Sequence, residues 1–448
     1  MRTEFWVGTY AKRGEEAILR VRCDFAAGTM TVGGAEEEPH SGEASRADGM
    51  TRKERAPRAD GAAQGRMVYC GIENPSYLLC HPNGRVLYAV EERNPDGGVC
   101  ALAVEKNGRL LQLLDTLPTG GADPCHLSLD AQNEFLFAAN YTSGSLAVFR
   151  LDKEGRILER TQVLEHRQEA AVPPVSECVS KSSAGDFAAA RTEASAEPRA
   201  GRDPVRQEGP HVHFSVWHDG ELYVVDLGLD TVFRYALDRT SGRLTPCGAP
   251  LVLPAGRGPR HLAFAPGRPE RLYVLCELSS SVFFCERERE NYRSVQEISA
   301  LPERETGGEC SCGKDAADNA GTQTDGRAVG SGEWAANGQS AANVVKSTAA
   351  AIHFFADGRF LFTSNRGDDS IAVFRVQEDG RLEKTDCAPT GGTVPRDFGV
   401  FGEYLAAANQ DSHALTALRF DETAGRLVRI EGMELATQGR PVCIAPVR

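Results

Sequence analysis

An apolar strand of one shape recurs six times along the chain and is the strongest pattern in the sequence. The first four residues of every copy are alike, whereas the sixth residue changes from copy to copy. The copies begin at Leu87, Leu136, Leu222, Leu272, Leu361 and Leu405. Their sixth residues are Glu92, Tyr141, Leu227, Glu277, Arg366 and Gln410. A repeat with a constant apolar body and one variable end indicates a scaffold that presents different side chains from equivalent places.

Each repeated strand lies inside a longer unit of four short strands. A first strand and a tight turn precede it, and a third strand, a second turn and a fourth strand follow it. The second turn carries Gly-Arg-Leu or a close variant, at Gly108, Gly155, Gly242, Gly380 and Gly425. Four short strands per unit, with glycine-bearing turns and no helical periodicity, predict the blade of a β-propeller.

The number of first strands predicts the number of blades. These strands begin at Pro75, Pro124, His211, Pro259, Ala349, Pro395 and Pro441. The last has no downstream partner and the N-terminal strand has no upstream one, so together they would complete a blade and leave no open sheet edge. We therefore predict an all-β fold, a single seven-bladed β-propeller over residues 1–448, with four-stranded antiparallel blades and a ring closed by the N- and C-terminal strands. Two β-sandwiches are the alternative.

Three segments interrupt the repeat, at residues 33–66, 165–208 and 302–346. They are rich in alanine, glycine, serine and charged residues, and they lack apolar periodicity. Such segments cannot bury enough apolar surface to order themselves. Because the entropy cost of closing a loop grows slowly with its length, a propeller tolerates them as surface loops. We predict three disordered surface inserts.

Composition and charge limit the kinds of partner and the cellular compartment that we expect for this chain. The 448-residue chain has a formal net charge of −13, which disfavours nucleic acid, where a basic surface is expected. The N-terminus leads straight into a predicted strand without signal-peptide features, and no apolar run approaches the roughly 20 residues of a membrane span. The 13 cysteines are scattered, which favours reduced thiols. We expect a cytoplasmic protein, monomeric or weakly homo-oligomeric, that binds neither nucleic acid nor membrane.

Candidate chemistry lies in the central channel, because the innermost strands of a propeller direct their polar side chains towards one axis. The first strands supply His126, His211, His213, Arg260, His261 and Arg396. The ends of the repeated strands supply Glu92, Glu277, Arg366 and Gln410. Any one of these residues could instead belong to a hydrogen-bonded or ion-paired core. An excess of arginines favours an anionic ligand, because unpaired buried cations are costly.

Metal binding is a competing interpretation of the histidines. His211 and His213 lie two residues apart on a predicted strand, so both would face one side and could ligate a metal ion. The interleaved arginines would repel a cation. We therefore expect no metal site and no cofactor.

Motifs that span nearly the whole chain outside the inserts resemble the lactonase β-propeller family, which includes propeller-type 6-phosphogluconolactonases and carboxymuconate-lactonising enzymes. The motifs are Phe5-Trp-Val-Gly-Thr-Tyr10, Gly121-Ala-Asp-Pro-Cys-His-Leu-Ser128, Ala139-Asn-Tyr-Thr-Ser-Gly-Ser145, Gly209-Pro-His-Val-His213, Gly258-Pro-Arg-His-Leu-Ala-Phe264, Cys276-Glu-Leu-Ser-Ser280, Ser364-Asn-Arg-Gly367 and Pro395-Arg-Asp-Phe398. The chain departs from the family pattern at Val212, Glu91, Cys276 and Ala351. The last departure removes an acidic residue from the channel.

The resemblance implies which residues form the site. The family's proposed set of one histidine, two arginines and one glutamate falls on Glu277, Arg260, Arg366 and either His211 or His213. Further substrate contacts are expected from Arg396, His261, His126, Glu92 and Gln410.

The implied activity is metal-independent hydrolysis of 6-phosphogluconolactone. Glu277 or a channel histidine would activate water, and Arg260 would stabilise the oxyanion. Arg366 and Arg396 would bind the phosphate, because a guanidinium matches phosphate geometry. Two alternatives stay open: an enzyme for a muconate-type or non-phosphorylated sugar lactone, and a non-catalytic propeller that binds proteins.

Overall fold

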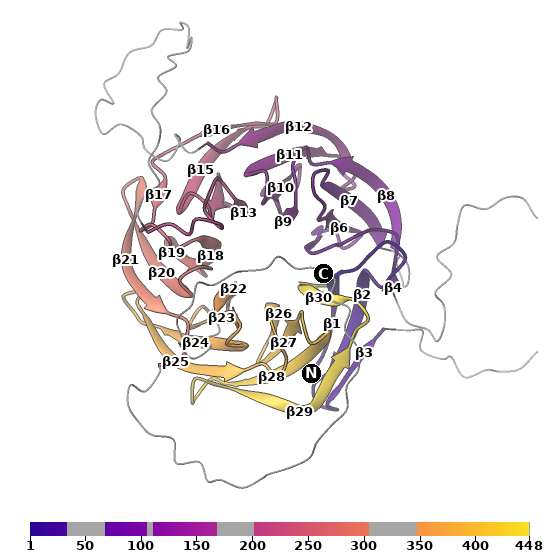
Figure 1. Ribbon diagram of the computed structural model, residues 1–448, viewed down its shortest axis with the longest axis vertical. Coiled ribbons are helices and arrows are strands. Elements are labelled where there is room, and N and C mark those ends of the chain that lie inside the picture. The colour runs from indigo at the N-terminus through magenta and orange to yellow at the C-terminus, as the bar shows by residue number, and fades with distance from the viewer. Residues whose placement is uncertain (34–67, 105–110, 168–200, 304–346, 448) are drawn as a thin grey trace, which may run out of the picture.

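The structure is a ring of β-sheets around a central axis (Figure 1). It is a computed structural model that describes residues 1–33, 68–104, 111–167, 201–303 and 347–447. These residues form strands and turns, and none of them belongs to a helix that could cross a membrane.

Six of the seven blades follow one another along the chain, and the first four strands of each pair in sequence order, while β17 pairs with β15. The first three blades contain β5 (Leu78–Cys80), β6 (Val86–Glu91), β7 (Gly98–Val104) and β8 (Leu111–Pro118); β9 (Pro124–Leu129), β10 (Phe135–Asn140), β11 (Ser145–Leu151) and β12 (Ile157–Glu165); and β13 (Val212–His218), β14 (Glu221–Asp226), β15 (Thr231–Asp238), β16 (Arg243–Pro246) and β17 (Leu251–Val252). The next three contain β18 (Pro259–Ala265), β19 (Arg268–Cys276), β20 (Ser281–Glu288) and β21 (Asn291–Ser299); β22 (Thr348–Phe354), β23 (Phe360–Arg366), β24 (Ser370–Val376) and β25 (Leu382–Pro389); and β26 (Pro395–Phe401), β27 (Tyr404–Asn409), β28 (Ala414–Asp421) and β29 (Arg426–Ala436).

The seventh blade joins the two ends of the chain. It contains β1 (Arg2–Tyr10), β2 (Ile18–Asp24), β3 (Thr29–Val32), β4 (Val68–Tyr69) and β30 (Arg440–Pro446). Strand β30 pairs antiparallel with β1 and is the innermost strand of this blade. The predicted seven-bladed propeller, closed by the N- and C-terminal strands, is therefore confirmed.

The repeated apolar strand is the second strand of its blade. All six residues of β10 are buried, whereas the outermost strand β12 is largely exposed or half-buried. A second strand packs against the neighbouring blades with both faces, so it has no polar face, and this explains the uninterrupted apolar run. Seven apolar clusters, each shared by two adjacent blades, form the core around the ring.

A β-bulge recurs near the start of the innermost strand in six of the seven blades. One additional residue lies there without a partner in the second strand, and a bulge of this kind re-aims the side chain it carries. The additional residues are Cys125, His213, Arg260, Arg396 and Val442, and in β22 Ala350 and Ala351 together oppose Ser364. Three of these are candidate site residues. The same β-bulge, repeated around the ring, therefore positions many of the candidate side chains.

The predicted inserts fall mainly outside the described residues. Most of 33–66, 165–208 and 302–346 belongs to the undescribed ranges, but residues 201–208 are described. Arg202 Nε lies 3.4 Å from Asp230 Oδ2, and the Gln207 amide donates a hydrogen bond of 2.8 Å to the Leu227 carbonyl. These contacts hold residues 201–208, called the arm below, against the blade that begins with β13.

Candidate active site

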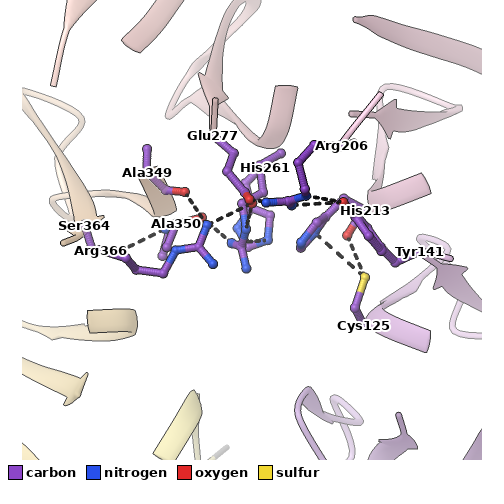
Figure 2. A network of polar contacts seen from close by, with 12 residues as sticks. Cys125, Tyr141, Arg206, His213, His261, Glu277, Ala349, Ala350, Ser364 and Arg366 are labelled. Atoms are coloured by element: carbon purple, nitrogen blue, oxygen red, sulfur yellow. Dashed lines mark hydrogen bonds and ion pairs between the residues drawn. The ribbon is translucent and has the colours of Figure 1, made fainter. Parts of the chain in front are cut away.

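Glu277 lies at the centre of a cluster of arginines. It follows β19 directly and is 1% exposed. Its Oε1 lies 2.6 Å from Arg206 Nη2, while its Oε2 lies 3.0 Å from Arg260 Nε and 2.9 Å from Arg366 Nη2. Figure 2 shows Glu277 between Arg206 and Arg366. Both carboxylate oxygens are therefore occupied by guanidinium groups.

The three arginines reach Glu277 from different parts of the chain. Arg260 is the bulge residue of β18, Arg366 is the last residue of β23, and Arg206 belongs to the arm. Arg260 also donates hydrogen bonds to His261 Nε2, at 3.1 Å, and to the Ala350 carbonyl. Arg366 donates one of 3.1 Å to the Ala349 carbonyl. Two adjacent blades and the arm thus share one carboxylate.

Charge and burial shift the pKa values of this cluster. Burial alone would raise the pKa of Glu277, but Arg366, Arg206 and Arg260 together hold that pKa well below its usual range. Burial, with the positive charge of Arg366, lowers the pKa of Arg260 to about 9. At neutral pH the cluster is therefore a carboxylate surrounded by guanidinium cations.

His213 lies beside the cluster and is neutral. It is the bulge residue of β13, and burial together with the charge of Arg260 lowers its pKa well below the usual range. Its Nδ1 lies 3.8 Å from the Cys125 sulfur, and its ring meets the edge of the Tyr141 ring at 5.6 Å (Figure 2). In the described part of the chain, its Nε2 has no hydrogen-bond partner.

His211 is held away from Glu277 by its own contacts. Its Nδ1 lies 3.0 Å from the Tyr141 carbonyl oxygen, and its Nε2 lies 3.0 Å from Glu208 Oε1. The ring stacks on that of Tyr141 at 4.5 Å. Both ring nitrogens of His211 are therefore engaged by neighbouring groups.

Arg396 is the fourth arginine, and its guanidinium is the least satisfied of the four. It is the bulge residue of β26 and lies 5.3 Å from the centroid of the Tyr10 ring. Among the described residues it makes no hydrogen bond or ion pair. The nearby Glu92 carboxylate instead accepts hydrogen bonds from Tyr10, at 2.8 Å, and from Ser76.

The remaining predicted site residues make no contact with Glu277 among the described residues, although His261 accepts a hydrogen bond from Arg260. The Gln410 amide donates a 3.0 Å hydrogen bond to Asp411, and its carbonyl oxygen is buried without a partner in the described structure. The His126 ring is tilted against those of Tyr77 and Phe214, with centroid distances of 4.2 and 4.1 Å. His261 follows Arg260 on β18 and lines the other half of the channel together with His126. The predicted residues thus fall into two layers.

Two residues of the cluster were missed by the sequence reasoning. Arg206 lies in a segment predicted to be disordered, and no periodicity marks its contact with Glu277 across 71 residues. Tyr141 had a signal, because it is the sixth residue of a repeated strand, as Glu277 and Arg366 are. Its hydroxyl accepts hydrogen bonds of 3.1 and 2.9 Å from Arg206.

The departures from the family pattern are accommodated locally. Glu91 pairs with Arg13 at 2.9 Å and with Arg93 at 3.4 Å. Cys276, Val212 and Ala351 are fully buried. Within the described ranges, no group of three or more histidine, cysteine, aspartate or glutamate residues could hold a metal ion.

The fold and the site define the class of protein. Residues 55–446 match the family described as lactonase, 7-bladed β-propeller, and the chain belongs to this family. The chain is 33% identical over 382 residues to a 6-phosphogluconolactonase of Bacillus subtilis, covering 83% of this chain and 87% of the relative. A 6-phosphogluconolactonase of Formosa agariphila is 26% identical over 380 residues, covering 82% and 87%. The protein is therefore a lactonase of the propeller type.

Solved structures support the same fold. The periplasmic gluconolactonase of Pseudomonas aeruginosa aligns with a TM-score of 0.70 at 24% identity, covering 100% of both chains. A protein of Lactobacillus plantarum aligns with a TM-score of 0.69 at 22% identity, again over 100% of both. At these identities the likeness concerns the propeller architecture alone.

Proposed function

We propose that this chain hydrolyses 6-phosphogluconolactone to 6-phosphogluconate without a metal ion. The observation that carries the proposal is the Arg396 guanidinium, which has no hydrogen bond or ion pair among the described residues although it lies near a cationic cluster. The name of the Bacillus subtilis relative, a 6-phosphogluconolactonase, supports the same substrate.

The charge of the site favours a dianionic substrate. Four guanidinium groups, those of Arg206, Arg260, Arg366 and Arg396, accompany only the carboxylates of Glu277 and Glu92. An excess of two positive charges in a buried region is unfavourable unless an anion compensates it. A phosphate ester supplies that charge and accepts two parallel hydrogen bonds from one guanidinium.

We assign the general base to His213. A general base must be unprotonated at the working pH and must have a free lone pair, and the neutral His213 with an unpartnered Nε2 meets both conditions. Glu277 is a poor base because three arginines stabilise its ionised form and occupy both oxygens. Its role in this proposal is to position the arginines.

We assign the stabilisation of the oxyanion to Arg366 and Arg206 rather than to Arg260. The side chain of Arg260 is 3% exposed, whereas those of Arg366 and Arg206 are 15% and 35% exposed and can reach a substrate. As His213 takes a proton from water, the oxygen of that water bonds to the lactone carbonyl carbon. The ester bond to the ring oxygen then breaks, and the ring oxygen receives the proton from His213.

The proposal is tested by comparing a phosphorylated with a plain lactone. For 6-phosphogluconolactone, Arg396→Ala is expected to raise KM about 10- to 100-fold, the loss of one charge-assisted contact. Hydrolysis of unphosphorylated gluconolactone should change less than about twofold, because that substrate lacks the phosphate. Spontaneous hydrolysis is subtracted, and EDTA is expected to have no effect.

Two outcomes would contradict the proposal. Equal losses for both lactones would remove Arg396 from the phosphate site. Faster turnover of the plain lactone or of a muconate-type lactone by the wild-type enzyme would show that the proposed substrate is wrong. The enzyme would still be a lactonase.

A further inference from the structure

A cavity of about 590 Å³ occupies the half of the channel opposite the arginine cluster. The arginine cluster lies where the innermost strands begin, and the cavity is lined by the middle and the end of the same strands, up to Pro82 in the turn after β5. Arg260 and His261, neighbours on β18, mark the boundary between the two halves. Cavities of 300–1,000 Å³ are typical of small-molecule sites.

Aromatic rings and imidazoles form part of the wall of the cavity. Tyr77, Phe214, Trp217 and Phe354 contribute rings from three blades, and the imidazoles of His126 and His261 complete the wall. The ring of His261 lies 4.9 Å from that of Phe214 and 5.8 Å from that of His126. Such flat surfaces bind ring-shaped ligands without fixing a single orientation.

The two histidines also present hydrogen-bond donors. Arg260 donates to His261 Nε2 at 3.1 Å, so the neutral imidazole carries its proton on Nδ1. The Ser215 amide donates to His126 Nδ1 at 3.4 Å, so that ring carries its proton on Nε2. Neither N–H has an acceptor among the described residues, and neither atom is sealed from open space.

The Tyr77 hydroxyl is a third donor, beside the N–H groups of His126 and His261. It too has no hydrogen-bond partner within the described structure and is not sealed from open space. Three donors on an aromatic wall are therefore available to the oxygen atoms of a ligand.

The charge of the cavity differs from that of the arginine end. No lysine or arginine lines it. Of its two carboxylates, Asp130 lies 2.7 Å from Arg239 Nη2 and Asp397 lies 3.2 Å from His353 Nε2. The lining therefore offers a phosphorylated ligand no lysine or arginine that is free of a carboxylate, which favours an uncharged ligand.

We propose that this cavity is a second ligand site, for an uncharged sugar of monosaccharide size. The C–H face of a pyranose packs on aromatic rings, while its hydroxyl and ring oxygens accept hydrogen bonds from His126, His261 and Tyr77. This site is distinct from the substrate site in position and in the charge of its ligand.

The test measures binding of methyl α-D-glucopyranoside to the full chain by titration calorimetry and by tryptophan fluorescence, since Trp217 lines the cavity. Ala263→Phe fills the cavity from β18 and is expected to weaken binding at least about tenfold. Tyr77→Phe keeps the ring and removes one hydroxyl, with an expected loss of about three- to tenfold. Arg396→Ala, at the other end, should leave binding of the glucoside unchanged.

The sugar site is overturned if the glucoside gives no heat at tens of millimolar, or if Arg396→Ala weakens binding while Ala263→Phe and Tyr77→Phe do not. Binding of glucose 6-phosphate at the cavity in preference to the glucoside would contradict the uncharged ligand. Binding of adenosine without binding of the glucoside would contradict the sugar. Tyr77→Phe keeps the test valid if Ala263→Phe fails to fold.

Discussion

The two ends of the channel are built from the same innermost strands, yet they differ in charge and in chemistry. At one end Arg206, Arg260 and Arg366 surround Glu277. At the other, aromatic rings and neutral histidines line a cavity without lysine or arginine. On β18 the change occurs between Arg260 and His261, which are consecutive residues. The scaffold therefore sets where side chains converge, while single residues on each strand set what each end can bind.

The largest expected effect comes from removing the negative charge of Glu277, at the centre of the arginine cluster. Glu277→Gln leaves the buried Arg260 guanidinium and the partly buried ones of Arg206 and Arg366 without their carboxylate, so we expect the free energy of unfolding to fall by about 3–5 kcal/mol. We also expect kcat/KM to fall about 100- to 1,000-fold, because the arginines lose their positions. Urea unfolding and the lactonase assay measure the two effects.

Inorganic phosphate should restore part of the lost stability of Glu277→Gln, because it can replace the missing negative charge. Glu159→Gln is the matched control, since Glu159 pairs with Arg150 at 3.2 Å on the surface with 60% of its side chain exposed. That control should change stability by less than about 1 kcal/mol. Equal effects of the two substitutions would show that the buried cluster has no special role.

A smaller loss is expected from the arm. Arg206→Ala removes one of the three cations on Glu277 and the hydrogen bonds to Tyr141, so kcat/KM should fall about 10- to 100-fold. Arg167→Ala, on the other side of the same insert and 78% exposed, is the control and should have no measurable effect. An unchanged kcat/KM in Arg206→Ala would exclude the arm from the active site.

The pH profile tests the neutral histidine beside the cluster. Because His213 has a lowered pKa, kcat/KM should stay flat as pH falls to about 6.5, the ordinary histidine value, and should decline only below it. Arg260→Met removes a charge that lowers this pKa, so the decline should move to higher pH. A decline that begins above pH 6.5 in the wild-type enzyme would contradict the assignment of His213 as base.

The histidines with lowered pKa values also make the stability of the fold depend on pH. His126, His213 and His261 have lowered pKa values in the folded state, so the unfolded chain binds more protons below about pH 6.5. Their contribution to stability is complete above that pH and is lost as the pH falls below it. The midpoint of thermal unfolding, followed from pH 8 to pH 5, measures this loss.

The smallest effect concerns salt. At the cationic end, KM for the phosphorylated lactone should rise severalfold as salt increases, because ions screen the arginines over a Debye length of about 10 Å at 0.1 M. Binding of an uncharged glucoside at the aromatic end should not depend on salt. Equal salt dependence at both ends would remove the distinction between them.

The sequence predicted the scaffold well because its signal is local and repeated. The apolar second strands, such as Phe135–Asn140, are buried on both faces, so their composition reveals them directly. Glu277, Arg260 and Arg366 could be predicted because they occupy strand positions whose place in the ring follows from the repeat.

The remaining features depend on contacts that no periodicity records. Arg206 reaches Glu277 from a low-complexity segment, 71 residues away. His211 and His213 could not be separated, because only the bulge at His213 turns that residue out of the strand register. The sequence also does not show that the side chain of Arg260 is only 3% exposed, which is why we propose Arg366 and Arg206 in its place at the oxyanion.

The recurring bulge identifies positions at which this enzyme could be redesigned. A bulge residue has no partner across the strand pair, so a substitution there leaves the register of the blade unchanged. Cys125 and Val442 occupy bulges equivalent to those of Arg260 and Arg396 but carry small uncharged side chains. A polar side chain at either position would therefore change the chemistry of the channel without shifting the register of the blade.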